Sequence, residues 1–279
     1  MEPTIHEEND SQLSRSALLS MSPGAERAMS ILDRVTVDPT GQEITVYTDP
    51  DSEPIQVRVL AQFPTGLGDS LVNASLEDLK RQPGYFYVEG EYSASIYATT
   101  RQDASAAYRM AVGNEPLTWH RHPRCAHRII TVITGSGGAL ASFSLATEQE
   151  IEENPKTLVQ KMLIVELPPD AQVCIRFNGF TYHQFGPMDP AHPAFAGFSV
   201  HKNERDEFTE VRSEQWSGTE SLMDESSAGS IPLFTRCIPE SVQSVLNQPG
   251  VLQEVPRFRL GGLPYQTSVP ERGTKVGQR

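Results

Sequence analysis

The chain is short of cysteine, has no long apolar run and carries no excess of positive charge. Its three cysteines, Cys125, Cys174 and Cys237, are an odd number without a repeated spacing, which argues against a framework of disulfide bonds. No stretch approaches the roughly 18 consecutive apolar residues that a membrane-spanning helix needs. Residues 1–10 are acidic and polar and lack the apolar core of a secretory signal. We therefore expect a soluble protein of the reducing cytoplasm.

The charge balance narrows the range of partners. Acidic residues outnumber basic ones by 36 to 23, so the formal net charge is −13. Such a charge repels phosphate backbones and anionic lipids. It therefore argues against nucleic acid and membrane surfaces as partners and favours a small molecule.

Size and composition favour one folded domain with extensions. The chain has 279 residues, of which 38% are hydrophobic, enough to bury one substantial core. Residues 1–21 are polar and without periodicity and are predicted to form a flexible arm. Residues 22–204 are expected to form the main domain, which has an α+β extension on its N-terminal side. Residues 205–279 are expected to hold a linker, a short helix and a tail, because 213–230 is rich in Ser, Gly and Glu.

Few segments have helical signals. Ser22-Pro23 offers a cap followed by proline at the first helical position. Ser75 with an acidic residue three positions later predicts a cap for a helix through Leu79. A third helix is expected over residues 239–246.

Strand signals dominate the rest of the chain. Ile44–Thr48 and Ile55–Leu60 are β-branched runs separated by turn residues, which predicts a hairpin. Gly135–Gly138 follows a strand, opens no helix and has no lysine, so a hairpin turn is expected there as well. Many short strands without intervening helices favour a jelly roll or sandwich. Further strands are predicted over residues 85–88, 95–98, 128–133, 139–145, 158–167, 172–177 and 194–201.

Two histidines two positions apart are the strongest functional signal. Alternate residues of an extended strand point to the same face, so His120 and His122 can hold one metal ion together. A third histidine, His183, follows the turn residues Asn178-Gly179 and begins another apolar segment. A pair with a distant single histidine is a typical set of metal ligands.

These residues resemble the two motifs of the cupin superfamily, over about residues 116–204. The first cupin motif has His-x-His, a short gap, Glu and later Gly; here His120-x-His122 is followed by four residues, His127 and later Gly135. Histidine thus stands where most cupins carry glutamate. In the second motif, Gly179 and His183 are separated by one residue more than usual. The resemblance implies an all-β fold, a cupin-like jelly-roll β-barrel with short helices in its N- and C-terminal extensions.

Cupins with three histidines and no glutamate include the thiol dioxygenases, which add dioxygen to a substrate sulfur at iron. They carry a Ser-x-His-x-Tyr run after the third metal ligand, and the segment Ser199-x-His201 is similar, with Asn203 in place of the tyrosine. The resemblance implies Fe(II) as cofactor, with Zn, Mn, Ni and Cu as alternatives. It also implies dioxygen and a small substrate with a carboxylate or thiol. Because cupins commonly pair through sheet edges, a homodimer is expected too.

Residues around the first motif are candidates for proton transfer and substrate binding. His127 is open to three interpretations: a fourth ligand, an outer hydrogen-bond partner of a ligand, or a strand residue with a satisfied imidazole. We favour the second, because metal ligands need such support, and we interpret His201 likewise as a catalytic residue outside the ligand set. Arg124 and Arg128 are candidates for a clamp on a substrate carboxylate. Arg121 alternates away from the two ligands.

Three other residues with reactive side chains are left outside the site. Cys125 is interpreted as a buried or oxidisable thiol, because the three histidines already complete a ligand set. His6 and His192 are interpreted as solvated residues of an arm and a loop.

Three hypotheses follow for the function. The first is a mononuclear non-haem iron enzyme that activates dioxygen, with His120, His122 and His183 as metal ligands. The second is a cupin whose metal acts as a Lewis acid without redox, as in an isomerase, lyase or hydrolase. The third is a non-catalytic cupin that binds a ligand. Oxygen consumption separates the first two hypotheses.

Overall fold

The structure is a computed structural model, and it describes residues 31–48, 53–83, 85–88, 90–96, 106–122, 127–202 and 236–263. Several predictions from the sequence lie outside these residues. They are the arm over 1–21, the start of a helix at Ser22, the linker over 213–230, and the roles given to His6, Arg124 and Cys125.

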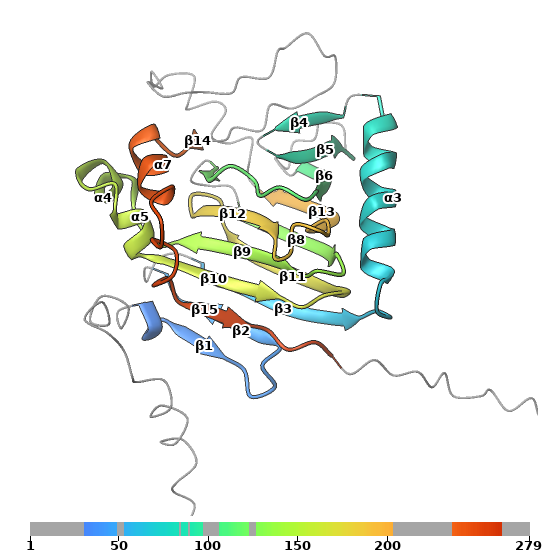
Figure 1. Ribbon diagram of the computed structural model, residues 1–279, viewed down its shortest axis with the longest axis horizontal. Coiled ribbons are helices and arrows are strands. Elements are labelled where there is room, and N and C mark those ends of the chain that lie inside the picture. The colour runs from blue at the N-terminus through green and yellow to red at the C-terminus, as the bar shows by residue number, and fades with distance from the viewer. Residues whose placement is uncertain are drawn as a thin grey trace, which may run out of the picture.

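Eight consecutive strands form two facing antiparallel sheets (Figure 1). Their order is β6-β13-β8-β11 in one sheet and β7-β12-β9-β10 in the other. The first strand of the eight therefore lies beside the last, and the second beside the seventh, which is the arrangement of a jelly roll made of two Greek keys. The prediction of an all-β jelly roll is confirmed. The eight strands are β6 (Ala106–Val112), β7 (His120–Arg121), β8 (His127–Thr134), β9 (Ala139–Ser144), β10 (Met162–Leu167), β11 (Ala171–Asn178), β12 (Tyr182–Pro187) and β13 (Phe195–Lys202).

Strands from both ends of the chain widen the two sheets. The first sheet continues from β11 into β3, β2 and β1, and from β6 into β5 and β4; the second is flanked by β14 and β15. The predicted hairpin is confirmed, because β2 and β3 pair antiparallel from Val46 opposite Ile55. These strands are β1 (Val35–Val37), β2 (Glu43–Val46), β3 (Ile55–Gln62), β4 (Phe86–Val88), β5 (Glu91–Ser95), β14 (Arg236–Cys237) and β15 (Arg257–Arg259).

The main core lies between the two sheets. Alternate residues of β11 are buried, and its inward side chains meet those of the facing sheet. This cluster is almost wholly aliphatic and aromatic, so burial of apolar surface stabilises the sandwich. Its members include Ile130, Val132, Val173, Ile175 and Phe177 from one sheet and Phe143, Val165 and Phe185 from the other.

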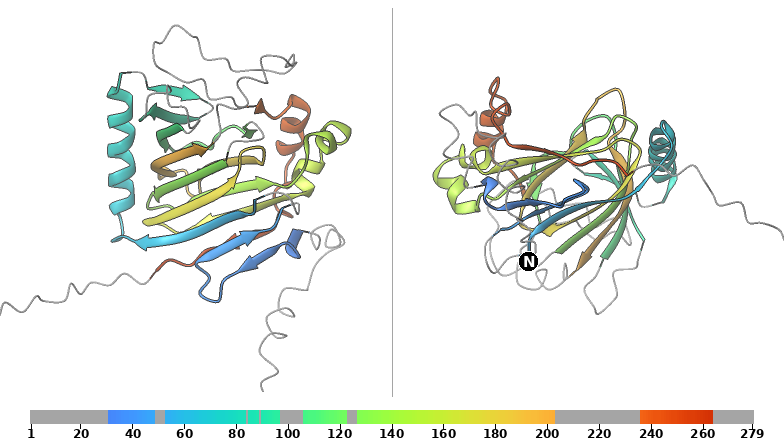
Figure 2. Two further views of the ribbon diagram at one scale, coloured as in Figure 1. Left: turned by 180° about the vertical axis from the view of Figure 1, so that it is seen from behind. Right: turned by 90° about the horizontal axis from the view of Figure 1, so that it is seen from below.

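Helices cover the outer faces (Figure 2). α3 (Leu67–Arg81) packs its buried residues against small side chains of the first sheet, and α4 (Glu148–Glu153), α5 (Thr157–Gln160) and α7 (Glu240–Leu246) pack on the other sheet. α7 begins after Pro239, as predicted. Within the described residues, no helix is long and apolar enough to cross a membrane.

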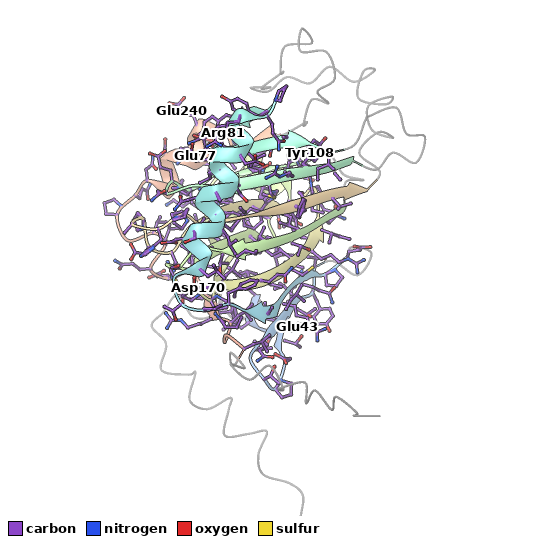
Figure 3. All side chains as sticks on the ribbon, turned by 90° about the vertical axis from the view of Figure 1, so that its right-hand side faces the viewer. Glu43, Glu77, Arg81, Tyr108, Asp170 and Glu240 are labelled. Atoms are coloured by element: carbon purple, nitrogen blue, oxygen red, sulfur yellow. The ribbon has the colours of Figure 1, made fainter. Side chains whose placement is uncertain are left out.

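The start of α3 was predicted wrongly. The helix begins at Leu67, not at Ser75, and the residue before it is Gly66 in a left-handed conformation. Its cap comes from a distant turn: the buried carboxylate of Asp170 accepts hydrogen bonds from the backbone N–H groups of Gly66 (3.1 Å) and Gly68 (2.7 Å). Figure 3 shows Asp170 beside this end of the helix. A cap from a residue 102 positions away leaves no local signal in the sequence.

Three other predictions need correction. Gly135–Gly138 joins β8 to β9, which belong to different sheets, so the turn is a crossover between sheets and not a hairpin. The strand expected over 158–167 is shortened, because Thr157–Gln160 is helical and β10 starts at Met162. The strand expected over 95–98 runs over Glu91–Ser95.

Candidate metal centre

Three histidines converge at one end of the sandwich. His120 and His183 are direct register partners on the neighbouring strands β7 and β12, and His122 follows two residues after His120. The ring centroid of His120 lies 4.4 Å from that of His183 and 4.9 Å from that of His122. One nitrogen from each ring lies within 4.8 Å of the others. The predicted ligand set is therefore one cluster in space.

The backbone around the cluster is tied together locally. Leu117 donates its N–H to the carbonyl of Phe185 (2.7 Å), which aligns the approach to β7 with β12. Gln184 Nε2 donates to the carbonyl of Leu117 (2.6 Å). The N–H of His122 donates to the carbonyl of Gly179 (2.7 Å), so the turn before β12 also holds the second histidine. The second motif has one extra residue between Gly179 and His183, and because β12 starts only at Tyr182, this extra residue belongs to the turn before the strand.

Two of the imidazoles are oriented in the same way. The Nδ1 atom of His120 lies 2.7 Å from the carbonyl oxygen of Thr118, and that of His183 lies 2.8 Å from the carbonyl oxygen of Thr181. Because a carbonyl can only accept, each Nδ1 carries the proton and donates it. Nε2 of each ring is then left as the atom with a lone pair for a metal.

The three histidines are buried, and aromatic rings lie beside them. His120, His122 and His183 are only 6%, 8% and 2% exposed. The ring centroid of Phe177 lies 4.6 Å from that of His183, and the ring centroid of Phe185 lies 5.4 Å from it. The walls limit the rotation of His183 and exclude water from its neighbourhood.

The residues present fit a divalent transition metal. Imidazole suits Zn, Cu, Fe and Ni, and three neutral rings leave the ion its full charge. The cluster found within the described part of the chain consists of the three histidines and contains no carboxylate or thiolate. Three ligands on one side would leave positions of a six-coordinate ion open to other molecules.

Cupin domains are among the solved structures that have a weak similarity to this chain. The chain itself matches no protein-family model and no curated protein sequence. A cupin-2 domain protein from Rhodospirillum rubrum is 15% identical, with 61% of this chain and 87% of that chain covered and a TM-score of 0.32. The cupin domain of Cnp3 from Schizosaccharomyces pombe is 9% identical, with 48% and 77% covered and a TM-score of 0.30. The fold of this chain is shown by its own strand order, which is that of a jelly roll.

A form of 2-hydroxyethylphosphonate dioxygenase is also similar to this chain. It is 12% identical, with a TM-score of 0.31, and the match covers 50% of this chain but only 27% of the dioxygenase. Likeness at this level carries no information on activity or substrate.

The jelly roll also places the remaining predicted site residues, beginning with the two arginines. Arg128 is buried (2% exposed) and belongs to β8, on the sheet that faces the histidines. Arg121 points away from the ligands, as predicted, forms an ion pair with Glu148 and lies over the ring of Tyr182 at 5.4 Å. Burial raises the pKa of that tyrosine.

For His127 and His201 the structure describes only the backbone. His127 is the register partner of Asn178, at the start of β8, and His201 is the register partner of Arg128, near the end of β13. Their backbones therefore lie at the histidine end of the sandwich, while their catalytic roles stay predictions.

His192 is not simply solvated, which corrects the prediction. Its Nδ1 lies 2.6 Å from Oδ2 of Asp69, at the end of the sandwich where α3 begins, and the side chain is 34% exposed. The hydrogen bond to Asp69 raises the pKa of His192. Burial opposes the shift at Asp69, but its hydrogen bonds from His192 and from the N–H of Ser136 lower the pKa of that carboxyl. The pair joins α3 to two loops and takes no part in the metal centre.

Sequence reasoning did not assign two buried hydroxyl groups, those of Tyr108 and Ser199. Tyr108 and Ser199 are register partners on β6 and β13, and both are buried. Ser199 was noticed only as part of the thiol dioxygenase run. A strand that the sequence did not predict, β6, carries the tyrosine, so no pattern could have placed it inside.

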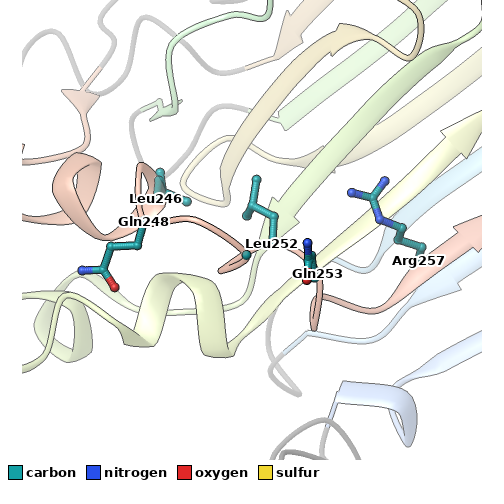
Figure 4. Close-up of a pocket in the computed structure, with 6 residues that line it drawn as sticks. Leu246, Gln248, Leu252, Gln253 and Arg257 are labelled. Atoms are coloured by element: carbon teal, nitrogen blue, oxygen red, sulfur yellow. The ribbon is translucent and has the colours of Figure 1, made fainter.

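A separate shallow pocket lies between α7 and β15 (Figure 4). Its lining contains no histidine, cysteine or carboxylate, so it offers no typical ligand for a transition metal and no group for acid–base chemistry near neutral pH. The lining residues are Leu246, Gln248, Gly250, Leu252, Gln253 and Arg257.

Proposed function

We propose that this protein is a mononuclear iron enzyme of the cupin type that activates dioxygen on a small substrate bearing a carboxylate or a thiol. The observation that carries the proposal is the buried cluster of His120, His122 and His183, in which no carboxylate joins among the described residues. Fe(II) held there would supply redox chemistry and open coordination positions for substrate and dioxygen.

The residues of the chain prepare the site in three ways. The Thr118 and Thr181 carbonyls hold the rings of His120 and His183 so that Nε2 of each faces the centre. The aromatic wall keeps water away, which strengthens every electrostatic interaction inside. His127 and His201 are proposed to hold or move protons at the histidine end, where their backbones lie.

The same cluster suits zinc acting as a Lewis acid, so the test must separate the two chemistries. The protein is purified without oxygen, reconstituted with Fe(II) or Zn(II), and given 3-mercaptopropionate, which carries both a thiol and a carboxylate. We expect an oxygen electrode to record oxygen uptake with the Fe(II)-loaded protein and not with the Zn(II)-loaded protein. Turnover without oxygen, or equal turnover with Zn(II), would refute the dioxygenase and favour the non-redox alternative.

Ligand identity is tested by metal content. His120→Ala, His122→Ala and His183→Ala are each expected to lose stoichiometric metal, while the circular dichroism spectrum stays that of the wild type. His192→Ala is the matched control, because that histidine lies in the Asp69 pair at the other end of the sandwich. Full metal occupancy in one of the first three variants would remove that residue from the ligand set.

A further inference from the structure

The strand that carries His120 has little backbone pairing of its own. β7 has two residues, and a single register pair, His120 with His183, joins it to β12. Its other neighbour, β14, is equally short. Backbone hydrogen bonds of Leu117 and His122 flank the strand on its two sides. Strands usually have about 3–10 residues, so the position of β7 depends on side-chain contacts as well as on its backbone.

Arg121 makes such contacts on the outer face of the sheet. It follows His120 directly, so its side chain points away from the histidines. Tyr182 precedes His183 and points the same way, and the guanidinium carbon of Arg121 lies 5.4 Å from the centroid of its ring. The same guanidinium forms an ion pair with Glu148, the first residue of α4. α4 follows β9, the neighbour of β12, so one side chain joins β7 to β12 and to the segment after β9.

A gain in stability does not account for this ion pair. The side chains of Arg121 and Glu148 are only 16% and 31% exposed, and removing two charges from water costs about as much as their attraction returns. Nε of Arg121 is buried and makes no hydrogen bond within the described part of the chain, which is a further cost. What the pair does supply is orientation, because a planar guanidinium that meets both a carboxylate and an aromatic face has little freedom.

We propose that Arg121 is a positioning residue of the metal centre, which acts with Tyr182 and Glu148 to hold β7 at a fixed distance from β12. His120 and His183 are direct register partners on these two strands, so a shift of β7 changes the separation of their ring nitrogens. A ligand set tolerates displacements of only about 0.5 Å. The inference rests on the proposed function for the presence of a metal ion, but the placement of the two imidazoles can be measured without one.

The test removes both charges of the pair and measures metal binding apart from stability. In the double variant Arg121→Met, Glu148→Gln, the affinity for Co(II), measured by competition with a coloured chelator, should fall about tenfold or more, and the visible spectrum of bound Co(II) should change. The midpoint of thermal unfolding of the metal-free protein should stay close to that of the wild type. The matched control is Arg109→Met, Asp78→Asn, which removes an ion pair between β6 and α3 on the other sheet and should leave both metal readouts unchanged.

A metal-free measurement separates this inference from the proposed function. Nuclear magnetic resonance of the histidine ring nitrogens reports which nitrogen carries the proton and what it bonds. The double variant should shift the ring signals of His120 and His183 but not those of His192, which lies in the Asp69 pair at the other end of the sandwich. A wild-type chain that takes up no Co(II) would refute the proposed function, and these signals would still decide the role of Arg121.

Three results would overturn the proposal. They are wild-type Co(II) affinity in the double variant, an equal loss of affinity in the control, and unchanged ring signals of His120 and His183. If the double variant does not fold, Glu148→Gln decides, because it keeps the shape of the side chain and loses the ion pair. Wild-type affinity in that variant counts against the proposal.

Discussion

Removing the ring of Phe177 should damage the metal centre more than the stability loss alone explains. Phe177 is fully buried and lies against the rings of His183, Phe143 and Phe185. Phe177→Ala should cost about 3–5 kcal/mol, the usual range for a buried phenylalanine. At about 2–4 °C per kcal/mol for a domain of this size, the midpoint of thermal unfolding should fall by roughly 6–20 °C.

The metal affinity gives the sharper readout. Without its wall the imidazole of His183 can rotate, and changes just outside a ligand set cost about tenfold or more in affinity. Phe195→Ala is the control, because Phe195 is equally buried and its ring meets that of Phe185 at 5.6 Å, away from His183. Metal affinity is measured by competition with a coloured chelator, and stability by thermal unfolding of the metal-free protein. Equal metal affinity in the two variants, with equal loss of stability, would refute a role for Phe177 in positioning His183.

The opposite end of the sandwich yields two more predictions. Asp170→Gly should keep the left-handed backbone at this position (φ 52°) but lose the hydrogen bonds to Gly66, Gly68 and the Ser136 hydroxyl, so the free energy of chemical unfolding should fall by about 2–4 kcal/mol. Asp170→Asn should lose less stability, because its side chain keeps a hydrogen-bond acceptor. Equal stability of Asp170→Gly and wild type would contradict the role of Asp170 as a cap. Because the pKa of His192 is raised in the folded state, its pair with Asp69 stabilises the fold fully below the ordinary histidine pKa of 6.5, and this stabilisation is lost as the pH rises through the folded-state pKa. The difference in unfolding free energy between wild type and His192→Gln should therefore be larger at pH 5.5 than at pH 8.5. A difference that grows with pH would contradict this pairing.

Local patterns predicted the cluster of three histidines, because short-range features of the sequence are enough to bring these residues together. His120 lies on β7 and His122 directly follows the end of this strand, while Asn178-Gly179 marks the turn before His183. The three residues come from two segments about sixty positions apart, and a strand period plus a turn is enough to bring them together. The jelly roll followed from the spacing of short strands in the same way.

Long-range contacts could not be predicted in this way. The cap of α3 by Asp170 and the pair of Asp69 with His192 join segments more than 100 residues apart. Which sheet a strand enters is also a non-local property, so the Gly135–Gly138 turn looked like a hairpin although it crosses between sheets. The inward position of Tyr108 depends on a strand, β6, whose small and apolar residues alternate too weakly to reveal its faces.

The strand order sets the sequence in which the metal centre is completed during synthesis. β7 carries His120 and has β12 on one side and β14 on the other, where Cys237 is the register partner of His120. A nascent chain leaves the ribosome from its N-terminus, so all three histidines emerge more than 50 residues before the strand that covers the second edge of β7. Until that strand arrives, His120 stands on a two-residue edge with open backbone groups. If the three histidines hold a metal ion, we therefore expect tight binding only after β14 has paired with β7.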